Sequence, residues 1–209
     1  VRFKNFHNEV LTPAIVTAHS PLAVSAWQTP GRLTSAQAAT ESFSGVPVGW
    51  RWGPVWSTAW FKLTGEIPQG NGELALRFSS GTEALLILSG EPFHGLDANH
   101  DLAIIPEGTQ PSDLLIEAAC NLPLGVSTFW WDEQEVQARW REANPGRLEF
   151  AEFVRIDQSM QQLASRFDFA RQLMLALPRD SSRAQHVSHS LRAAMDQVSP
   201  ATSSENAAA

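Results

Sequence analysis

The apolar residues recur at two different intervals in two parts of the chain, and this difference limits the folds that the chain can adopt. Between residues 58 and 118, apolar side chains alternate with polar ones in short runs separated by turn-forming residues. From Ile156 to Leu177 the apolar side chains instead recur at intervals of four and three. An interval of two is typical of half-buried strands, and an interval near 3.6 is typical of amphipathic helices. We therefore expect an antiparallel β-sandwich followed by helices.

The strand signals are short and regularly spaced. Residues 84–88 are apolar on both faces and predict a central strand, whereas residues 28–55 are rich in Gly, Pro, Ser and Thr and indicate mostly loop. We expect turns at 67–72 and 89–92, and a polar loop over 94–101. The expected strands are 22–27, 58–64, 74–79, 84–88, 102–105, 114–118 and 148–154.

Helical signals flank the strands. Residues 3–17 predict a short helix broken at Pro13, and residues 133–144 predict a helical insertion. Asp157 is placed to cap the long helix that ends at Pro178, and Asp180 or Ser181 to cap a second helix. The fold class is thus α+β, mainly β, of the jelly-roll or galactose-binding-like kind. Its expected parts are a lead-in helix and linker (1–21), a sandwich (22–156), a helical hairpin (157–198) and a disordered tail (199–209).

Charge and cysteine content exclude several classes of protein. The 15 basic and 22 acidic side chains give a net charge of −7 without a basic stripe, which argues against nucleic-acid binding. No apolar run approaches the roughly 18 residues of a membrane span. The single cysteine, Cys120, permits no disulfide within the chain, which favours a cytoplasmic location. Cys120 is either a nucleophile or a small buried hydrophobe, and its apolar, strand-like surroundings favour burial.

Tryptophan is the unusual residue. The chain has eight Trp and no Tyr, and Trp50, Trp52, Trp56 and Trp60 fall within eleven residues. Indole rings stack on the apolar faces of sugars and carry one N–H donor, so the cluster is consistent with a carbohydrate platform. The same rings are equally suited to sealing a sheet edge or an interface with another domain.

Two histidine-containing segments are candidate metal sites. Residues 94–101 hold two His and two Asp, but their spacing matches no zinc motif, so a polar loop is favoured. His186 and His189 lie three apart on the second helix, and two ligands alone make no site. The sequence also lacks a nucleophile elbow and a phosphate-binding glycine loop. We expect no metal site and no catalytic residue in this chain.

The Trp cluster is also the start of a family resemblance that spans nearly the whole chain. The chain resembles the N-terminal domain of family 38 α-mannosidases of the cytosolic and vacuolar type. The helical hairpin around Leu177-Pro-Arg-Asp-Ser181 is similar to that family as well. The segments that carry the resemblance are Trp52 to Phe61, Ile67-Pro68, Ser80 to Ala84, Gly90 to His100 and Ile116 to Asn121.

This resemblance implies a role in a longer enzyme. In the family, such a domain and a helical linker precede a catalytic domain that binds zinc and uses an Asp nucleophile in a retaining mechanism. That domain carries a His-x-His-x-Asp type motif, which this sequence lacks. The chain is therefore expected to be a truncated, non-catalytic region without a cofactor of its own.

Partners and contact residues follow from the same resemblance. The expected partners are the catalytic domain of an α-mannosidase, a second copy of the chain, or a mannose-containing glycan. The alternatives are a free-standing carbohydrate-binding module and a structural oligomerisation domain. An unpartnered apolar stripe on the hairpin predicts self-association. The residues expected to contact carbohydrate or another domain are Trp52, Trp56, His94, Asp97 and His100.

Overall fold

The computed structural model describes residues 2–121, 138 and 141–198, which form two compact units. The first unit comprises residues 1–18, 70–73 and 155–209, and the second comprises residues 19–69 and 74–154. The second unit contains most of the strands, and the first contains the long helices.

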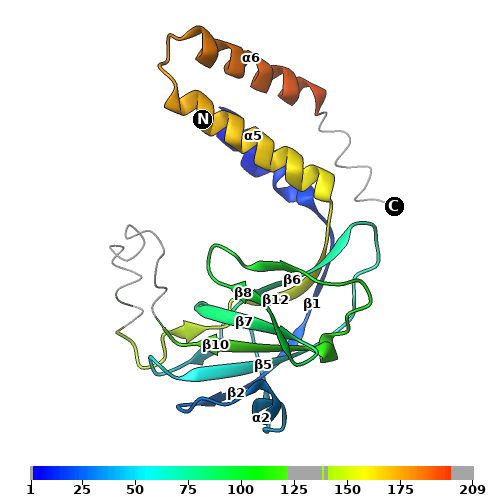
Figure 1. Ribbon diagram of the computed structural model, residues 1–209, viewed down its shortest axis with the longest axis vertical. Coiled ribbons are helices and arrows are strands. Elements are labelled where there is room, and N and C mark those ends of the chain that lie inside the picture. The colour runs from blue at the N-terminus through cyan, green and yellow to red at the C-terminus, as the bar shows by residue number, and fades with distance from the viewer. Residues whose placement is uncertain (1, 122–137, 139–140, 199–209) are drawn as a thin grey trace. The chain divides into compact units, whose positions relative to one another are not determined.

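A six-stranded antiparallel sheet dominates the second unit. Its strands lie in the order β3-β2-β5-β10-β7-β8, and Figure 1 shows most of them side by side. The neighbours β2 and β5, β5 and β10, β10 and β7, and β7 and β8 all pair antiparallel. The bounds are β2 (Ala23–Thr29), β3 (Ser44–Val46), β5 (Thr58–Thr64), β7 (Glu83–Leu88), β8 (Glu91–Leu96) and β10 (Leu114–Ala119).

Two smaller sheets complete the β structure. A four-stranded sheet has the order β1-β12-β6-β9, and a ribbon joins β11 to β4. The bounds are β1 (Val16–Pro21), β4 (Arg51–Trp52), β6 (Glu73–Ser79), β9 (Leu102–Ile104), β11 (Gly146–Arg147) and β12 (Phe150–Ile156).

The core of the sandwich is built from the alternating apolar positions. Phe61 of β5 and Phe78 of β6 are almost fully buried, and their rings meet edge to face with centroids 5.3 Å apart. Ile116 of β10 and Phe153 of β12 belong to the same buried cluster. Cys120, directly after β10, is fully buried in it, which confirms the expected role as a small hydrophobe. The predicted sandwich is thus confirmed.

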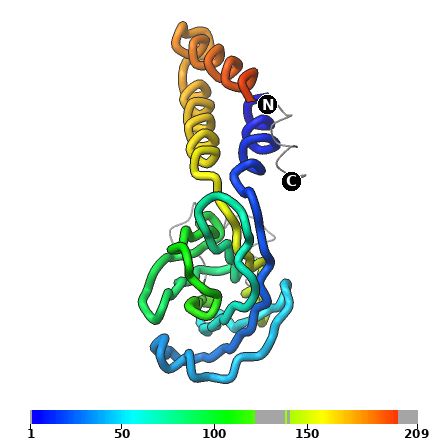
Figure 2. Tube along the Cα trace, turned by 90° about the vertical axis from the view of Figure 1, so that its right-hand side faces the viewer, coloured from blue at the N-terminus to red at the C-terminus, as the bar shows by residue number. Residues whose placement is uncertain are grey.

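The helices of the first unit also agree with the sequence pattern. Asp157 caps α5 (Gln158–Ala176) by accepting a hydrogen bond from the Met160 N–H at 3.0 Å. Ser181 caps α6 (Ser182–Gln197) in the same way. Figure 2 shows α5 and α6 as a hairpin.

Within the described residues, no helix is long and apolar enough to cross a membrane. The N-terminal segment forms α1 (Arg2–Phe6), a π-helical turn (His7–Leu11) and a 3-10 turn (Pro13–Ile15).

Sequence reasoning missed the shortest elements. The stretch expected to be mostly loop contains β3, β4 and α2 (Ser35–Ala39), which Thr34 and Gln37 stabilise as a capping box. Strand β8 lies where a turn and a polar loop were expected, because its side chains are exposed up to Gly95 and show no apolar alternation. A 3-10 turn (Pro111–Asp113) precedes β10. The predicted tail and nearly all of the predicted insertion lie outside the described residues.

Candidate functional site

Trp52 is a core residue. It is fully buried and its indole N–H donates to the Ser80 carbonyl at 3.3 Å. Its strand β4 pairs with β11, where Gly146 lies opposite Trp52, and a Cβ atom at Gly146 would clash with the ring. The expectation that Trp52 contacts carbohydrate or another domain is therefore wrong, because its faces are covered by its own domain.

Trp56 has the opposite environment. Its side chain is 70% exposed, and its backbone φ of 72° lies in the left-handed region, which is a genuine outlier for a bulky residue. The conformation is held by a hydrogen bond from the Trp56 N–H to the Cys120 carbonyl at 2.7 Å. Left-handed backbone costs about 1–2 kcal/mol in a residue with a side chain. Strain of this kind at an exposed aromatic residue is a feature of binding sites.

A hydrogen-bonded pair lies beside this turn. The Asn121 amide donates to the Glu83 carboxylate at 2.6 Å, joining the end of β10 to the start of β7. The other amide atom, Asn121 Oδ1, is buried and has no hydrogen-bond partner within the described residues. A buried acceptor without a donor costs about 1–3 kcal/mol, so this end of the sheet holds unused hydrogen-bonding capacity.

Asp97 and His100 form a self-contained turn after β8. Asp97 Oδ1 accepts hydrogen bonds from the backbone N–H groups of Asn99 (2.6 Å) and His100 (2.9 Å). The imidazole of His100 lies 3.1 Å from the same carboxylate. Burial opposes ionisation, but these hydrogen bonds outweigh it and hold the pKa of Asp97 below its usual range. The carboxylate therefore stabilises the turn.

Replacing Asp97 by Asn is expected to lower the stability of the turn at neutral pH. The lowered pKa means that the contribution of the carboxylate is present above the unfolded-state pKa and is lost as the pH falls through the folded-state pKa. We expect the variant to melt about 2–4 °C lower at pH 7, which corresponds to about 1 kcal/mol, and the difference to shrink steadily as the pH falls below about 4. Thermal unfolding across this pH range measures the difference, and a constant value would contradict the assignment.

His94 is exposed on the edge strand β8, opposite Leu86, and does not belong to this turn. Among the residues that the structure describes, no group of three or more His, Cys, Asp or Glu side chains is placed to hold a metal ion. His186 and His189 are exposed on α6.

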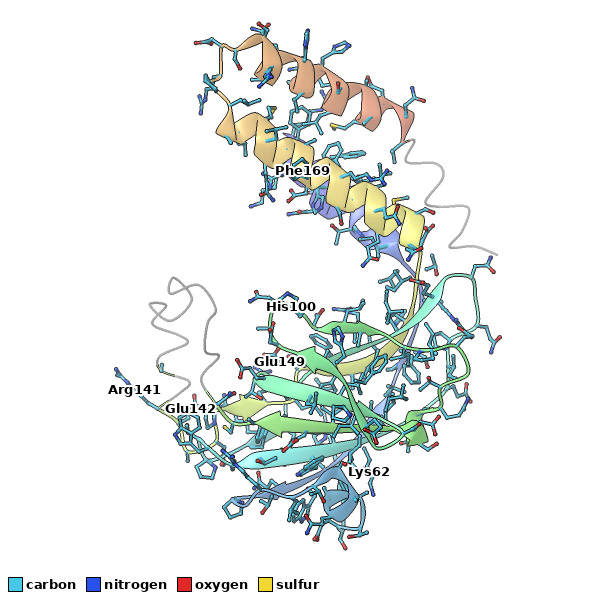
Figure 3. All side chains as sticks on the ribbon, viewed as in Figure 1. Lys62, His100, Arg141, Glu142, Glu149 and Phe169 are labelled. Atoms are coloured by element: carbon cyan, nitrogen blue, oxygen red, sulfur yellow. The ribbon has the colours of Figure 1, made fainter. Side chains whose placement is uncertain are left out.

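Strand register brings most of these groups to one end of the six-stranded sheet. Thr58 lies opposite Ala119, which lies opposite Glu83, and Ala84 lies opposite Leu96. Strands are about 4.8 Å apart, so the turn of Trp56 and the turn of Asp97 are separated by roughly 14 Å across three strand spacings. Figure 3 labels His100 on the second of these turns. We call Trp56, Glu83, Asp97, His100 and Asn121 the sheet-end group.

Sequence reasoning missed a second group, on the outer face of the same sheet. Trp27, Trp60, Glu117 and Leu85 lie opposite one another across β2, β5, β10 and β7. Trp60 packs with Ile87 and the α2 residue Ala38 in a cluster separate from the main core. We call Trp27, Trp60, Glu117 and Leu85 the outer-face row. The alternating pattern of the sequence predicts that Trp60 and Phe61 point to opposite faces of the sheet. Only the pairing of β5 with β10 shows that Trp60 lies opposite Glu117.

Glu117 is the charged member of this row. Burial raises the pKa of its carboxyl, and the positive charge of Arg32 partly offsets the rise. A raised pKa means that the ionised form is disfavoured in the folded chain, so stability is lost as the pH rises through the range between the unfolded-state and folded-state values.

Substituting Glu117 by Gln is therefore expected to stabilise the chain at neutral pH. The gain should be about 1 kcal/mol at most, or about 2–4 °C in melting temperature, because the side chain is only half-buried. Below about pH 4 the gain should vanish, since the carboxyl is then neutral in both states. Melting curves across this range measure it, and a destabilised variant at pH 7 would show that the carboxylate serves the fold.

The helical unit presents an apolar surface of its own. Phe169 and Leu173 lie four residues apart on α5 and are 71% and 43% exposed. Residues at this spacing share one helix face, and Figure 3 labels Phe169 there. Leu175 is also exposed. We call Phe169 and Leu173 the α5 patch.

Comparison with known proteins gives the context for these surfaces. A family model described as "Alpha-mannosidase, jelly roll domain" matches residues 20–143, which confirms the jelly-roll prediction. The chain is 34% identical to α-mannosidase 2C1 of Mus musculus over 114 residues, which is 50% of this chain. It is 33% identical to α-mannosidase 2C1 of Homo sapiens over 119 residues, which is 52% of this chain. Each match covers 11% of the relative's length. The chain belongs to the family of α-mannosidase jelly roll domains.

Proposed function

We propose that this chain is the non-catalytic jelly-roll region of a zinc-dependent, retaining α-mannosidase, and that it packs on the catalytic domain and contributes to assembly. The observation that carries this proposal is the family match over residues 20–143, and the two relatives support it because each match covers only 11% of the relative's length. Within residues 2–121, 138 and 141–198, no three potential ligands are placed to hold a metal ion, so the described residues do not fit a zinc site. Zinc would be held elsewhere in such an enzyme.

The helical hairpin supports the packing role. Residues 157–198 connect the jelly-roll region to the catalytic domain in this proposal, with α5 and α6 as its two helices. The inner faces of these helices are buried against each other and against Leu11 and Phe6 of the N-terminal segment. The α5 patch remains uncovered, and burying an exposed Phe or Leu side chain contributes about 1.5–3 kcal/mol. The patch therefore suits a contact with protein.

The sheet-end group supplies a second contact surface. Trp56 offers an exposed aromatic ring on a strained turn, and aromatic residues are enriched at the centres of protein interfaces. Asp97 and His100 are the members of this group on the turn after β8, and His94 lies beside the group on β8 itself. We assign these four residues to contact with the catalytic domain.

The association state of the purified chain tests the packing role. An uncovered contact surface is expected to produce concentration-dependent self-association, which light scattering detects as a rise in mean mass. A strict monomer across the micromolar to millimolar range would argue against a surface that packs on another protein domain.

A further inference from the structure

Within the outer-face row, the environment of Glu117 is not explained by packing. Its side chain is half-buried between Trp60 on one neighbouring strand and Leu85 on the other. The structure records no hydrogen bond or ion pair between its carboxylate and any described residue. Placing a carboxylate on an apolar surface without donors costs free energy, so the fold alone gives no reason for this residue.

Trp60, directly opposite Glu117, has a hydrogen-bond donor that lacks an acceptor. Its side chain is 1% exposed, and its indole N–H has no acceptor within the described residues. Buried polar groups in folded proteins are nearly always paired, directly or through water. A donor without an acceptor thus lies beside an acceptor without a donor, on adjacent strands of one sheet face.

Trp27 extends the row with an aromatic face. It is half-buried and lies opposite Trp60 on the far side from Glu117. Leu85 and Leu115, both half-buried in the same cluster, continue the apolar surface beyond Glu117. An aromatic and apolar surface with a few unpaired polar groups is the usual composition of a small-molecule site.

The charges around the row favour a neutral ligand. Glu117 and Arg32 carry opposite charges and interact electrostatically, so together they add no net charge. Lys62, labelled in Figure 3, is engaged elsewhere: its ammonium donates to the Ala39 carbonyl at 2.8 Å and lies 4.3 Å from the centre of the Phe43 ring. An anion would face the Glu117 carboxylate, and a simple cation would face Arg32.

We propose that the outer face of the six-stranded sheet binds a neutral polyhydroxylated ring, one pyranose unit, over Trp27 and Glu117. The ring stacks on the Trp27 indole, and its hydroxyl groups donate to the Glu117 carboxylate. The Trp60 N–H lies on the neighbouring strand beside this contact, and a water bound with the sugar supplies its missing acceptor. The site thus differs from the sheet-end group, and only the choice of mannose as the first sugar rests on the proposed function.

Titration of the whole chain with methyl α-D-mannopyranoside tests the site, with the glucose and galactose analogues run in parallel. Indole N–H signals in NMR spectra report each Trp separately, and calorimetry gives the affinity. We expect a millimolar dissociation constant for at least one of the three sugars, with shifts at the Trp27 and Trp60 signals. Inorganic phosphate is the charged control and should shift neither signal.

Two variants carry the same change of charge. Glu117→Gln is expected to weaken sugar binding about tenfold, because a charge-assisted hydrogen bond becomes a neutral one. Glu91→Gln alters an exposed carboxylate on β8 and should leave the affinity unchanged. Trp60→Phe removes the N–H donor together with the five-membered ring and should also weaken binding. Melting curves establish that each variant is folded.

Three results would overturn the site. The first is the absence of binding by all three sugars at concentrations about tenfold above millimolar affinity. The second is binding that Trp56→Ala abolishes while Glu117→Gln leaves it intact, which would move the sugar to the sheet-end group. The third is a gain in self-association on Glu117→Gln without any sugar effect, which would make this face a protein contact. Association of the unmodified chain is measured separately, so failure of the sugar site leaves the packing role untouched.

Discussion

Replacing Trp52 by Ala is expected to lower the free energy of unfolding by about 3–5 kcal/mol, the range for removing a large aromatic side chain from a core. The indole is fully buried, meets Phe61 edge to face with centroids 6.1 Å apart, and donates to the Ser80 carbonyl. The substitution leaves a cavity and removes one of the two hydrogen bonds that the Ser80 carbonyl accepts, the other coming from the Arg147 N–H at 3.0 Å. For a domain of this size the melting temperature should fall by about 10 °C or more.

Trp56→Ala is the matched control, because the same side chain is removed four residues away. Its ring is 70% exposed, and Ala relieves none of the backbone strain, so the melting temperature should change by no more than about 2 °C. Chemical and thermal unfolding of both variants measure the contrast. Equal losses of stability would contradict the assignment of Trp52 to the core and Trp56 to the surface.

The double substitution Phe169→Asp with Leu173→Asp is expected to abolish self-association of the chain. Each change replaces an exposed apolar side chain of the α5 patch with a charge, and like charges then face each other across any symmetric contact. We expect the apparent association constant to fall at least about a hundredfold, since removing two buried anchors costs about 3 kcal/mol or more. Sedimentation equilibrium gives this constant directly.

Ser190→Asp provides the control on the other helix. Ser190 is exposed on α6, and the change adds a negative charge to the same unit without touching the α5 patch. Association should persist in this variant, and circular dichroism should show full helix content in both. Persistent association of the Phe169 and Leu173 variant would place the contact elsewhere, and dissociation by Ser190→Asp would show that net charge alone is responsible.

Much of the fold is predictable from the sequence because its main elements have a local cause. The strand over residues 58–64 was predicted at its observed bounds, since Phe61 and Leu63 alternate with polar neighbours. The helix starts follow from Asp157 and Ser181, whose side chains accept the expected backbone hydrogen bonds. Strand β8 has no such cause within its own sequence. It forms by pairing with the preceding strand β7 across the two-residue turn of Ser89 and Gly90, so its cause is a partner strand and a turn rather than its own apolar pattern.

The candidate sites were predictable only in part, for a related reason. Exposure of Trp56 and burial of Trp52 depend on which residues lie opposite them, and Gly146 is almost a hundred positions away from Trp52. The Trp60 and Glu117 pair likewise requires the register between β5 and β10. Sequence analysis correctly linked the Trp cluster to the α-mannosidase family. It did not separate Trp52, which is buried in the core, from Trp56, which is exposed.

Hydrolysis of 4-nitrophenyl α-D-mannopyranoside by the purified chain, with and without added Zn²⁺, is the decisive test of a non-catalytic role. We expect release of 4-nitrophenol at the rate of buffer alone under both conditions, because the proposed role assigns the catalytic groups and the metal site to another part of an α-mannosidase. Running Trp52→Ala beside the parent chain identifies any contaminating enzyme, since its activity would not follow the stability of this fold. Zinc-dependent turnover that disappears as this chain unfolds would contradict a non-catalytic role.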